Sequence, residues 1–190
     1  MKTRFIFLTM LTLCCTFILA GCKKSEDDPF LSLKSRDARI TGEWKLVEML
    51  DSSVETYSSP GFTETYVAVS RFDGTTAVYS ETYTDESGTS SDSSSHAYLM
   101  EITIKKDGAY KLVQSVDEET VNATGEWWWE SDTKNKSRIT LDDDMGSMTV
   151  ARLADKDLVL TRKIGYDDEY SGGQDGSYFS TYLRFEKVSE

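Results

Sequence analysis

The chain contains almost no cysteine. Its three cysteines, Cys14, Cys15 and Cys22, all lie within the first 22 of 190 residues. The remaining sequence therefore has no disulfide, no cysteine nucleophile and no thiolate metal ligand. A fold without such links must be held by its hydrophobic core, and a chain of this length can bury enough surface for that. We expect one folded domain after the N-terminal segment.

Positive charge is also scarce. Against 33 acidic residues the chain has 21 Lys and Arg, for a formal charge of −12 at pH 7. Loss of Lys2 and Arg4 with an N-terminal leader takes this value to −14. Nucleic-acid binding depends on Lys and Arg that neutralise phosphates, so we exclude nucleic acid as a partner. The same charge predicts a soluble monomer.

No pattern in the sequence indicates catalysis. His96 is the only histidine, and it ends a serine-rich stretch, residues 86–96, that contains six serines. We predict that this stretch is a mobile loop, which is a poor place to preorganise a catalytic group. A nucleophile with an adjacent base is not apparent either. We therefore expect a protein that is not an enzyme and that needs no cofactor. The alternative is a hydrolase, which would need His96 held against a serine and a carboxylate.

Two acidic runs are candidates for a calcium site. They are residues 142–144, and residues 167–169 with Asp175. Ca²⁺ takes several oxygen ligands from a loop in which acidic residues are spaced, and neither run has that spacing. We interpret both as solvated turns and predict no metal site.

The longest apolar run is at the N-terminus. Lys2 and Arg4 precede residues 5–20, which carry no charge, and the small residues Ala20 and Gly21 end the run. This order is typical of a secretory signal peptide. The run of 16 residues is shorter than the roughly 20 that span a bilayer. A cleaved leader, residues 1–21, is therefore preferred over a retained transmembrane helix.

The leader ends in Leu19-Ala20-Gly21-Cys22. This sequence resembles the lipobox of bacterial lipoproteins, in which the leader is cut before the cysteine and the thiol is acylated. A thiolate is a suitable nucleophile for that alkylation. The resemblance implies a lipid anchor at Cys22, and two or three acyl chains hold a protein stably on a membrane. The alternative is an ordinary cysteine near a cleavage site.

A polar, acidic segment follows the cysteine. Residues 25–28 read Ser-Glu-Asp-Asp, a composition typical of a solvated tether. They also resemble the signal that places lipoproteins of the Bacteroidota on the outer face of the outer membrane; a generic acidic linker is the alternative. We divide the chain into a leader (1–21), the acylated cysteine with an acidic linker (22–37) and a folded domain (38–190). We expect it to be lipid-anchored in the outer membrane, facing the cell exterior.

From residue 40 onward, short stretches alternate in polarity, which predicts strands. The Asp-Gly pairs at 73–74 and 107–108 are strong hairpin signals, whereas residues 86–96 and 166–176 are predicted connections. The ten predicted strands span 42–50, 63–72, 75–84, 98–106, 109–116, 125–131, 138–142, 147–153, 157–164 and 178–188. Short strands, tight turns and no convincing helix predict an all-β fold, a single antiparallel up-and-down β-barrel.

Several stretches are similar to the lipocalin-like domain of small Bacteroidota lipoproteins. Gly42-Glu43-Trp44 resembles the Gly-x-Trp first strand of lipocalins and other calycins. The other similar stretches, in chain order, are residues 106–110, 124–127, 138–141, 153–160 and 182–187. The resemblance covers residues 40–188 and implies an eight-stranded barrel. Because the strand pair at 63–84 is additional, we expect 8 to 10 strands.

The run Trp127-Trp128-Trp129 is unusual for its three adjacent large rings. On a strand, Trp127 and Trp129 share one face and Trp128 lies on the other, so at least one ring should be exposed. Such rings can stack on a flat ligand or anchor a partner. Two rings that fill the barrel interior are the preferred interpretation, because tryptophan is usually well buried.

These features favour a lipid-anchored binding protein. A barrel interior can hold a small molecule, so we expect non-catalytic binding of a small apolar or aromatic-stacking ligand, with Trp44, Trp127 and Trp129 lining the site. The alternative is a filled barrel that binds a protein or glycan through its loops and an exposed tryptophan. A cavity lined by these rings would favour the first function, and a barrel filled by side chains would favour the second.

Overall fold

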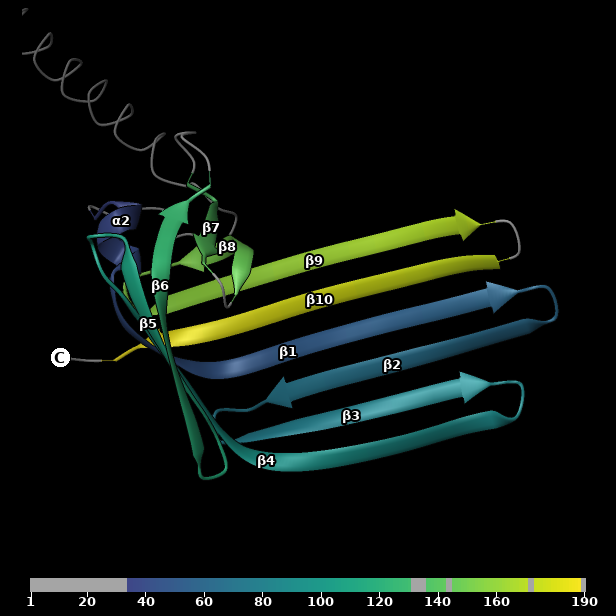
Figure 1. Ribbon diagram of the computed structural model, residues 1–190. Coiled ribbons are helices and arrows are strands. Elements are labelled where there is room, and N and C mark those ends of the chain that lie inside the picture. The colour runs from purple at the N-terminus through teal and green to yellow at the C-terminus, as the bar shows by residue number, and fades with distance from the viewer. Residues whose placement is uncertain (1–33, 131–135, 143–144, 171–172, 189–190) are drawn as a thin grey trace, which may run out of the picture.

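The computed structural model describes residues 34–130, 136–142, 145–170 and 173–188. These residues form ten antiparallel strands and the short helix α2 (Arg36–Ile40) (Figure 1). The strands are β1 (Gly42–Ser59), β2 (Phe62–Phe72), β3 (Thr76–Asp85), β4 (Gly88–Ile104), β5 (Ala109–Val116), β6 (Glu119–Trp129), β7 (Arg138–Leu141), β8 (Gly146–Leu153), β9 (Asp157–Tyr170) and β10 (Gly173–Lys187). The predicted all-β, up-and-down barrel is confirmed.

The sheet closes on itself in two ways. Each strand pairs with the next along the chain, and β1 pairs with β10. A further pairing joins the start of β1 to the end of β4, with Gly42 opposite Ile104 and Lys45 opposite Glu101. At that end the β2–β3 hairpin is therefore left out of the ring, and eight of the ten strands complete it. The additional strand pair of the sequence is thus a hairpin inserted into an eight-stranded ring.

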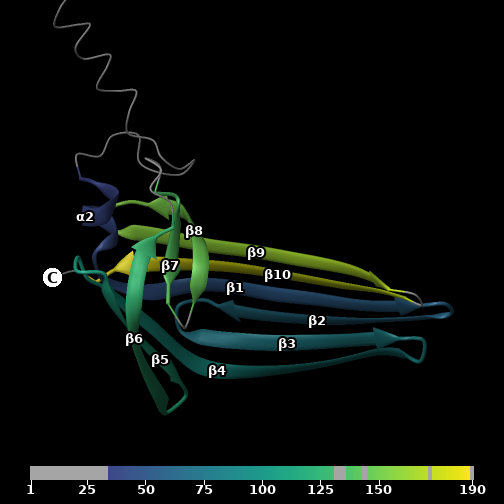
Figure 2. The same ribbon diagram turned by 45° about the horizontal axis from the view of Figure 1, so that its top comes forward.

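Six strands continue past this ring as a single-layered sheet, which we call the arm. The arm comprises β1 from residue 48, β2, β3, β4 to residue 97, β9 from residue 162 and β10 to residue 182. Their order across the arm is β9-β10-β1-β2-β3-β4, and they run side by side away from the barrel (Figures 1 and 2). The 11 residues of β2 give a length of roughly 37 Å at about 3.4 Å per residue. Helix α2 lies at the barrel end remote from the tips of the arm (Figure 1).

The hydrophobic core lies in the barrel. All eight strands of the ring contribute to it, with Trp44, Tyr110, Trp127 and Phe185 as its large rings. Among the described residues of the arm, only Phe72 is buried, at the junction with the barrel. No described element covers either face of the arm, so its strands are held by backbone pairing and by contacts within each face.

A predicted hairpin turn shows how the register of the arm is set. Asp73 Oδ1 accepts hydrogen bonds from the backbone N–H groups of Thr75 and Thr76, both at 3.0 Å. Gly74 has a φ of +102°, a conformation that a side chain disfavours. The Asp-Gly pair therefore joins β2 to β3 as the sequence predicted.

The serine-rich stretch is a strand, and the prediction of a mobile loop was wrong. Most of residues 86–96 belong to β4 and pair with β3. Hydroxyl pairs link the two strands: Thr82 Oγ1 to Ser91 Oγ, and Thr84 Oγ1 to Thr89 Oγ1, both at 3.1 Å. A strand with solvent on both faces needs no apolar residue at alternate positions, so its sequence lacks the signal that identifies strands.

Two other predicted connections also contain regular structure. Residues 166–176 include the ends of β9 and β10, and only residues 171–172 between them lie outside the described chain. The end of the predicted linker, residues 22–37, includes the start of α2. Ser35 caps this helix, because its Oγ accepts a hydrogen bond from Ala38 N at 3.1 Å.

Candidate functional site

Trp44, the first predicted ligand-binding residue, lies at one end of the barrel. Its side chain is fully buried, and its Nε1 donates a hydrogen bond to the Ile40 carbonyl at 2.7 Å. Lys187 Nζ lies 4.9 Å from the ring centroid, within cation–π range. The same ammonium group donates to the carbonyls of Arg39 and Thr41 at 3.2 and 2.8 Å. Both the face and the polar atom of the Trp44 ring are therefore engaged within the protein.

Trp127 and Trp129 point into the barrel, on the shared face that alternation predicts. Their ring centroids lie 6.0 Å apart with an interplanar angle of 85°, an edge-to-face contact. Trp127 Nε1 donates to the Lys105 carbonyl at 2.7 Å, and Trp129 Nε1 donates to Asp37 Oδ1 at 2.6 Å. Lys136 Nζ donates to the same carboxylate and lies 5.9 Å from the centroid of Trp129. Trp129 therefore ties strand β6 to helix α2, and Trp127 ties it to the turn after β4.

Trp128 faces away from the barrel interior. It is 45 % exposed and lies opposite Thr140 on β7. One exposed ring is what the alternation of this run predicted. A single ring on the outside of the barrel offers a contact but no enclosed site.

Helix α2 fills the barrel end with two arginine side chains. Arg36 and Arg39 are 1 % and 3 % exposed. Arg36 Nη2 donates to the Val150 carbonyl at 3.5 Å, and Arg39 Nη1 donates to the Leu153 carbonyl. Buried charge requires such hydrogen bonds. The barrel is therefore closed at this end by packed and hydrogen-bonded side chains.

Four surface hollows of the described chain lie away from the three predicted tryptophans. Their volumes range from about 310 to about 760 Å³, and none is lined by Trp44, Trp127 or Trp129. Three of them lie on the arm or where it joins the barrel, and the fourth lies at the barrel end beside Lys187. These hollows therefore give no support to a ligand site lined by the three tryptophans.

His96 lies on the arm rather than in a loop. Its Nδ1 is 2.9 Å from Asp117 Oδ2, an acidic partner 21 residues away in the chain. This hydrogen bond, together with one from Ala97 N at 3.0 Å, holds the pKa of Asp117 below its ordinary value. Within the described chain His96 has no hydrogen bond to a serine. The pair links the end of the arm portion of β4 to the β5–β6 turn.

The predicted lipid attachment at Cys22 lies outside the described residues, together with the leader and the Ser-Glu-Asp-Asp segment. These three features therefore remain predictions. The helix of the described chain is too short to cross a membrane.

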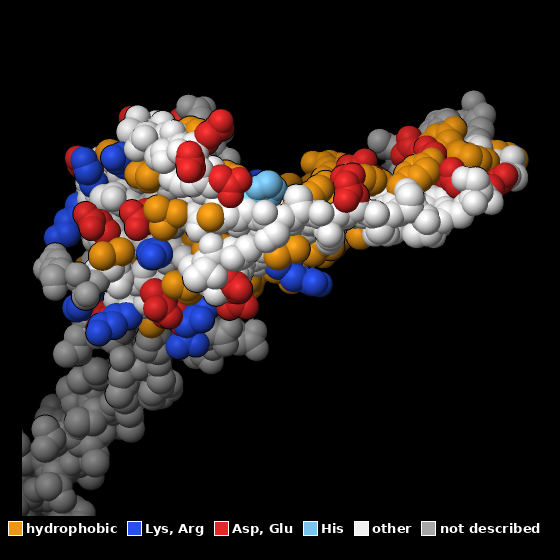
Figure 3. All heavy atoms as spheres, turned by 90° about the horizontal axis from the view of Figure 1, so that it is seen from below, with side chains coloured by type: hydrophobic (Ala, Val, Ile, Leu, Met, Phe, Trp, Pro, Cys, Tyr) orange, Lys and Arg blue, Asp and Glu red, His pale blue; other side chains and the backbone are white. Residues whose placement is uncertain are grey.

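The arm has two chemically different faces. Because side chains alternate along a strand, the register assigns each residue either to an inner face, continuous with the barrel interior, or to an outer face. The inner face is aromatic and acidic. Its aromatic residues are Tyr57, Phe62, Tyr66, Tyr79, Tyr83, Tyr166 and Phe179, and its acids include Asp51, Glu55, Glu64, Glu81, Asp92 and Asp175. Figure 3, which looks at the β4 edge, shows acidic and hydrophobic side chains gathered along one face of the arm.

Hydrogen bonds between tyrosines and carboxylates organise the inner face. Tyr66 and Tyr79 place their hydroxyl oxygens 2.8 Å apart, and both donate to Glu81 Oε2, at 2.8 and 2.9 Å. Contacts with the Tyr79 hydroxyl and the Glu81 carboxylate raise the pKa of Tyr66. Tyr83 donates to Glu64 Oε2 at 2.5 Å, and this bond raises the pKa of Tyr83 to about 12. The phenols of Tyr66 and Tyr83 therefore remain protonated donors at neutral pH.

The outer face carries hydroxyl and aliphatic side chains with a few cations. Its largest hollow, about 730 Å³, lies at the junction of arm and barrel. Leu50 and Val78, which are 41 % and 44 % exposed, line it together with Phe72. Its charged lining residues are of both signs, Arg71 and Arg184 with Glu48 and Asp73, and Arg184 is paired with Asp157 at 3.2 Å.

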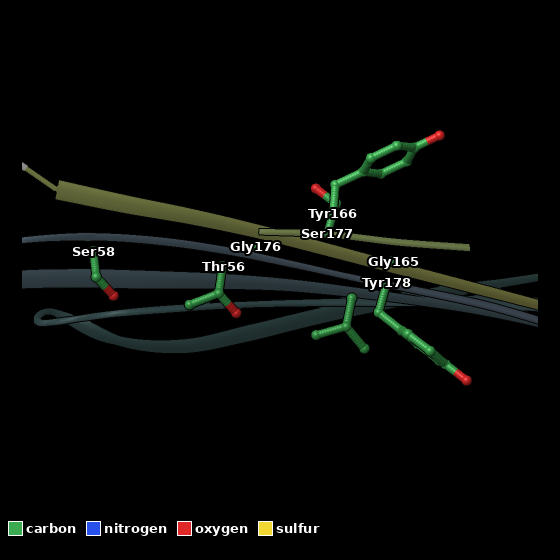
Figure 4. Close-up of a pocket in the computed structure, with 8 residues that line it drawn as sticks. Thr56, Ser58, Gly165, Tyr166, Gly176, Ser177 and Tyr178 are labelled. Atoms are coloured by element: carbon green, nitrogen blue, oxygen red, sulfur yellow. The ribbon is translucent and has the colours of Figure 1, made fainter. Parts of the chain in front are cut away.

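A second outer-face hollow, about 370 Å³, forms where two glycines leave space. Gly165 on β9 and Gly176 on β10 line it together with Thr56 and Tyr178. Figure 4 shows Thr56 and Tyr178 pointing to one side of the sheet and Tyr166 pointing to the other. This view agrees with the assignment of the two faces from the register.

No group of three or more His, Cys, Asp or Glu side chains that could hold a metal ion is found in the described part of the chain. A scan against protein-family models found no match to this chain. A search of curated proteins found no match either.

The sequence did not indicate that the inner face of the arm is an exposed surface. Alternation placed Tyr79, Glu81 and Tyr83 on one face of a strand, but rings on such a face equally fit the packing of a barrel. In the structure β1 and β4 have 18 and 17 residues, whereas strands of globular proteins usually have about 3 to 10. The serine-rich half of β4 has no alternation that would have revealed this length. Strands this long must extend past a small barrel.

Proposed function

We propose that this protein is a lipid-anchored, non-catalytic interaction module on the outer face of the outer membrane. In this proposal the filled barrel is a base and the arm presents the binding surface. In it, the predicted lipobox at Cys22 provides the lipid anchor, and the Ser-Glu-Asp-Asp segment directs the protein to the outer face of the outer membrane.

The observation that carries this proposal is the arm itself. Six strands extend about 37 Å from the core, and among the described residues of the arm only Phe72 is buried. A two-sided exposed sheet gains little from hydrophobic burial, so its retention as ordered structure requires a reason other than stability. Exposed aromatic side chains of the kind found here, such as Tyr166 at 60 % and Tyr178 at 44 %, are typical of surfaces that bind a partner.

The position of the arm relative to the anchor supports the same function. The chain enters the barrel through α2, and the tips of the arm lie at the opposite end of the molecule (Figure 1). Residues 23–35 span at most roughly 45 Å when extended. An anchor at Cys22 would therefore hold the barrel near the membrane and direct the arm away from it.

Photocrosslinking in intact cells tests the proposal. A benzophenone side chain is placed at Ser90 on the inner face of the arm, at Ser93 on its outer face, or at Lys111 on the outside of the barrel; all three positions are exposed. We expect macromolecular adducts from at least one arm position and none from Lys111. Adducts from Lys111 alone, or from all three positions alike, would contradict an arm-centred function.

A second candidate function is binding of a small apolar ligand, as the sequence first suggested. The specific observation that favours it is the hollow of about 730 Å³ whose apolar lining includes Leu50, Phe72 and Val78, a setting suited to an apolar molecule. Native mass spectrometry of protein purified from its source tests this function. A bound small molecule that is lost in Leu50→Asp would favour the carrier function over the interaction module.

A further inference from the structure

The inner face of the arm has a large excess of negative charge. Besides Asp85, which accepts hydrogen bonds in the β3–β4 turn, six of its described side chains are carboxylates: Asp51, Glu55, Glu64, Glu81, Asp92 and Asp175. Among the described residues, Arg162 is the one permanent cation on this face, and its Nη1 donates to the Met145 carbonyl at 3.1 Å. The charge of this face is therefore not balanced within the face.

The carboxylates of this face keep acceptor capacity for a partner. None of the six forms an ion pair with a cation of the described chain. At Glu64 and Glu81 the hydrogen bonds from tyrosine reach Oε2, and a carboxylate accepts at both oxygens. Like charges on neighbouring strands repel one another. A cationic partner would therefore reduce the repulsion between the carboxylates of the inner face.

Tyrosine rings lie between these carboxylates. Across the sheet the register places Glu55 opposite Tyr66 and Tyr66 opposite Tyr83, while Glu64 lies one row nearer the tip. A hollow of about 310 Å³ opens there, lined by these residues and by Tyr57. A ring face attracts Lys and Arg side chains, and a carboxylate beside it pairs with the same group. The combination selects a cation with an apolar stem.

We propose that the inner face of the arm binds a polypeptide segment rich in Lys or Arg. This inference rests on the proposed function and names the partner chemistry of the same arm. The carboxylates are spread over strands β10, β1, β2, β3 and β4, on a surface that is about 24 Å wide at about 4.8 Å per strand. Several separated anions on a flat surface fit a row of cationic side chains on one chain. A small cation would instead need carboxylates that converge on one point, and the described chain has no such group.

Fluorescence anisotropy with labelled decalysine and decaarginine tests the inference on the purified protein. The test variant is the triple change Glu55→Gln, Glu64→Gln and Glu81→Gln. The matched control, Glu101→Gln, Glu119→Gln and Glu126→Gln, removes the same charge from strands β4 and β6 of the barrel. We expect about tenfold weaker binding for the test variant and less than about twofold for the control at physiological salt. Affinity should fall as salt rises.

The triple test variant also removes carboxylates that accept hydrogen bonds from tyrosines. The single variant Glu55→Gln avoids this effect, because within the described chain no hydrogen bond to Glu55 is seen. It should weaken binding by about twofold to threefold without changing the circular dichroism spectrum. Equal losses in the two triple variants, or no binding of either peptide, would overturn the inference. A neutral glycan or a second copy of the chain that maps to the inner face would also overturn it and leave the arm-centred function standing. If neither arm position gave crosslinks in cells, both the arm-centred function and the binding of a Lys- or Arg-rich segment would be overturned.

Discussion

The barrel and the arm are built from the same strands but are stabilised differently. In the barrel, the inner face of β1 contributes Trp44 and Leu46, which are fully buried. In the arm, the same face of the same strand contributes Glu55 and Tyr57, which are exposed and half-exposed. Backbone pairing between β1 and β10 continues from one region to the other, with a register shift between Leu46 and Glu48 where the arm begins. A strand can therefore extend beyond its core when its neighbouring strands extend with it. Side chains on the extended part need not be apolar, so they can be polar or aromatic.

The largest expected effect is in the barrel. Trp44→Ala removes a ring with no exposed surface and its hydrogen bond to Ile40. We expect it to lower the free energy of unfolding by about 3–5 kcal/mol, measured by urea denaturation. The matched control is Trp128→Ala, the same change at a ring that is 45 % exposed, where a loss of about 1 kcal/mol is expected. Similar losses for both would show that the core is not where the structure places it.

A proline in the arm should break the arm and spare the barrel. Val67 lies in β2 between β1 and β3, so Val67→Pro removes a backbone donor from an interior strand at a local cost of about 3 kcal/mol. We expect faster amide hydrogen exchange in residues 48–97 and unchanged protection in β5–β8, measured by mass spectrometry. Val67→Ala keeps the N–H and serves as control. Loss of protection throughout the molecule would mean that arm and barrel unfold as one unit.

Acid should destabilise the turns of the arm. Hydrogen bonds from Thr76 and Thr75 to Asp73, and from Ser87 and Gly88 to Asp85, hold the pKa of each carboxyl below its ordinary value of 3.8. A lowered folded pKa gives stability that is present above pH 3.8 and is lost as the pH falls through the folded pKa. In the double variant Asp73→Asn/Asp85→Asn, the Tm should therefore fall less steeply than in the wild type as the pH is lowered below 3.8. Parallel Tm curves would contradict this account of the turns.

The smallest expected effect is a change in tyrosine titration. The hydrogen bond to Glu64 raises the pKa of Tyr83 to about 12. Glu64→Gln should bring this pKa back toward 10.0, because a neutral amide no longer favours the protonated phenol. Ultraviolet absorbance at high pH measures the change, and Glu119→Gln on the barrel is the control. An unaltered titration would show that the two side chains are not paired in solution.

Much of the fold could be predicted from local signals. Alternation identified all ten strands, and the turn at Asp73-Gly74 lies where the sequence placed it. The serine-rich part of β4 was missed, because hydroxyl residues form a strand here through pairing with β3 and not through burial. For the candidate site, the alternation of Trp127, Trp128 and Trp129 was predicted correctly. Their role as a ligand site remains a prediction, and the structure places none of them beside a described hollow.

The sequence by itself determined the strand pattern, the hairpin turns and the strong negative charge, because each depends on residues that are neighbours in the chain. It also carries the lipobox at Cys22, which predicts the anchor. Only the tertiary structure decided which stretch of each strand is covered. Whether Tyr66 packs in a core or lies on an exposed face depends on the β1–β4 pairing that closes the ring at Gly42 and Ile104, a contact between residues far apart in the chain. Side chains alternate with the same period on both sides of that closure, although a register shift between Leu46 and Glu48 separates the two stretches of β1. The period of the pattern therefore does not distinguish the barrel from the arm.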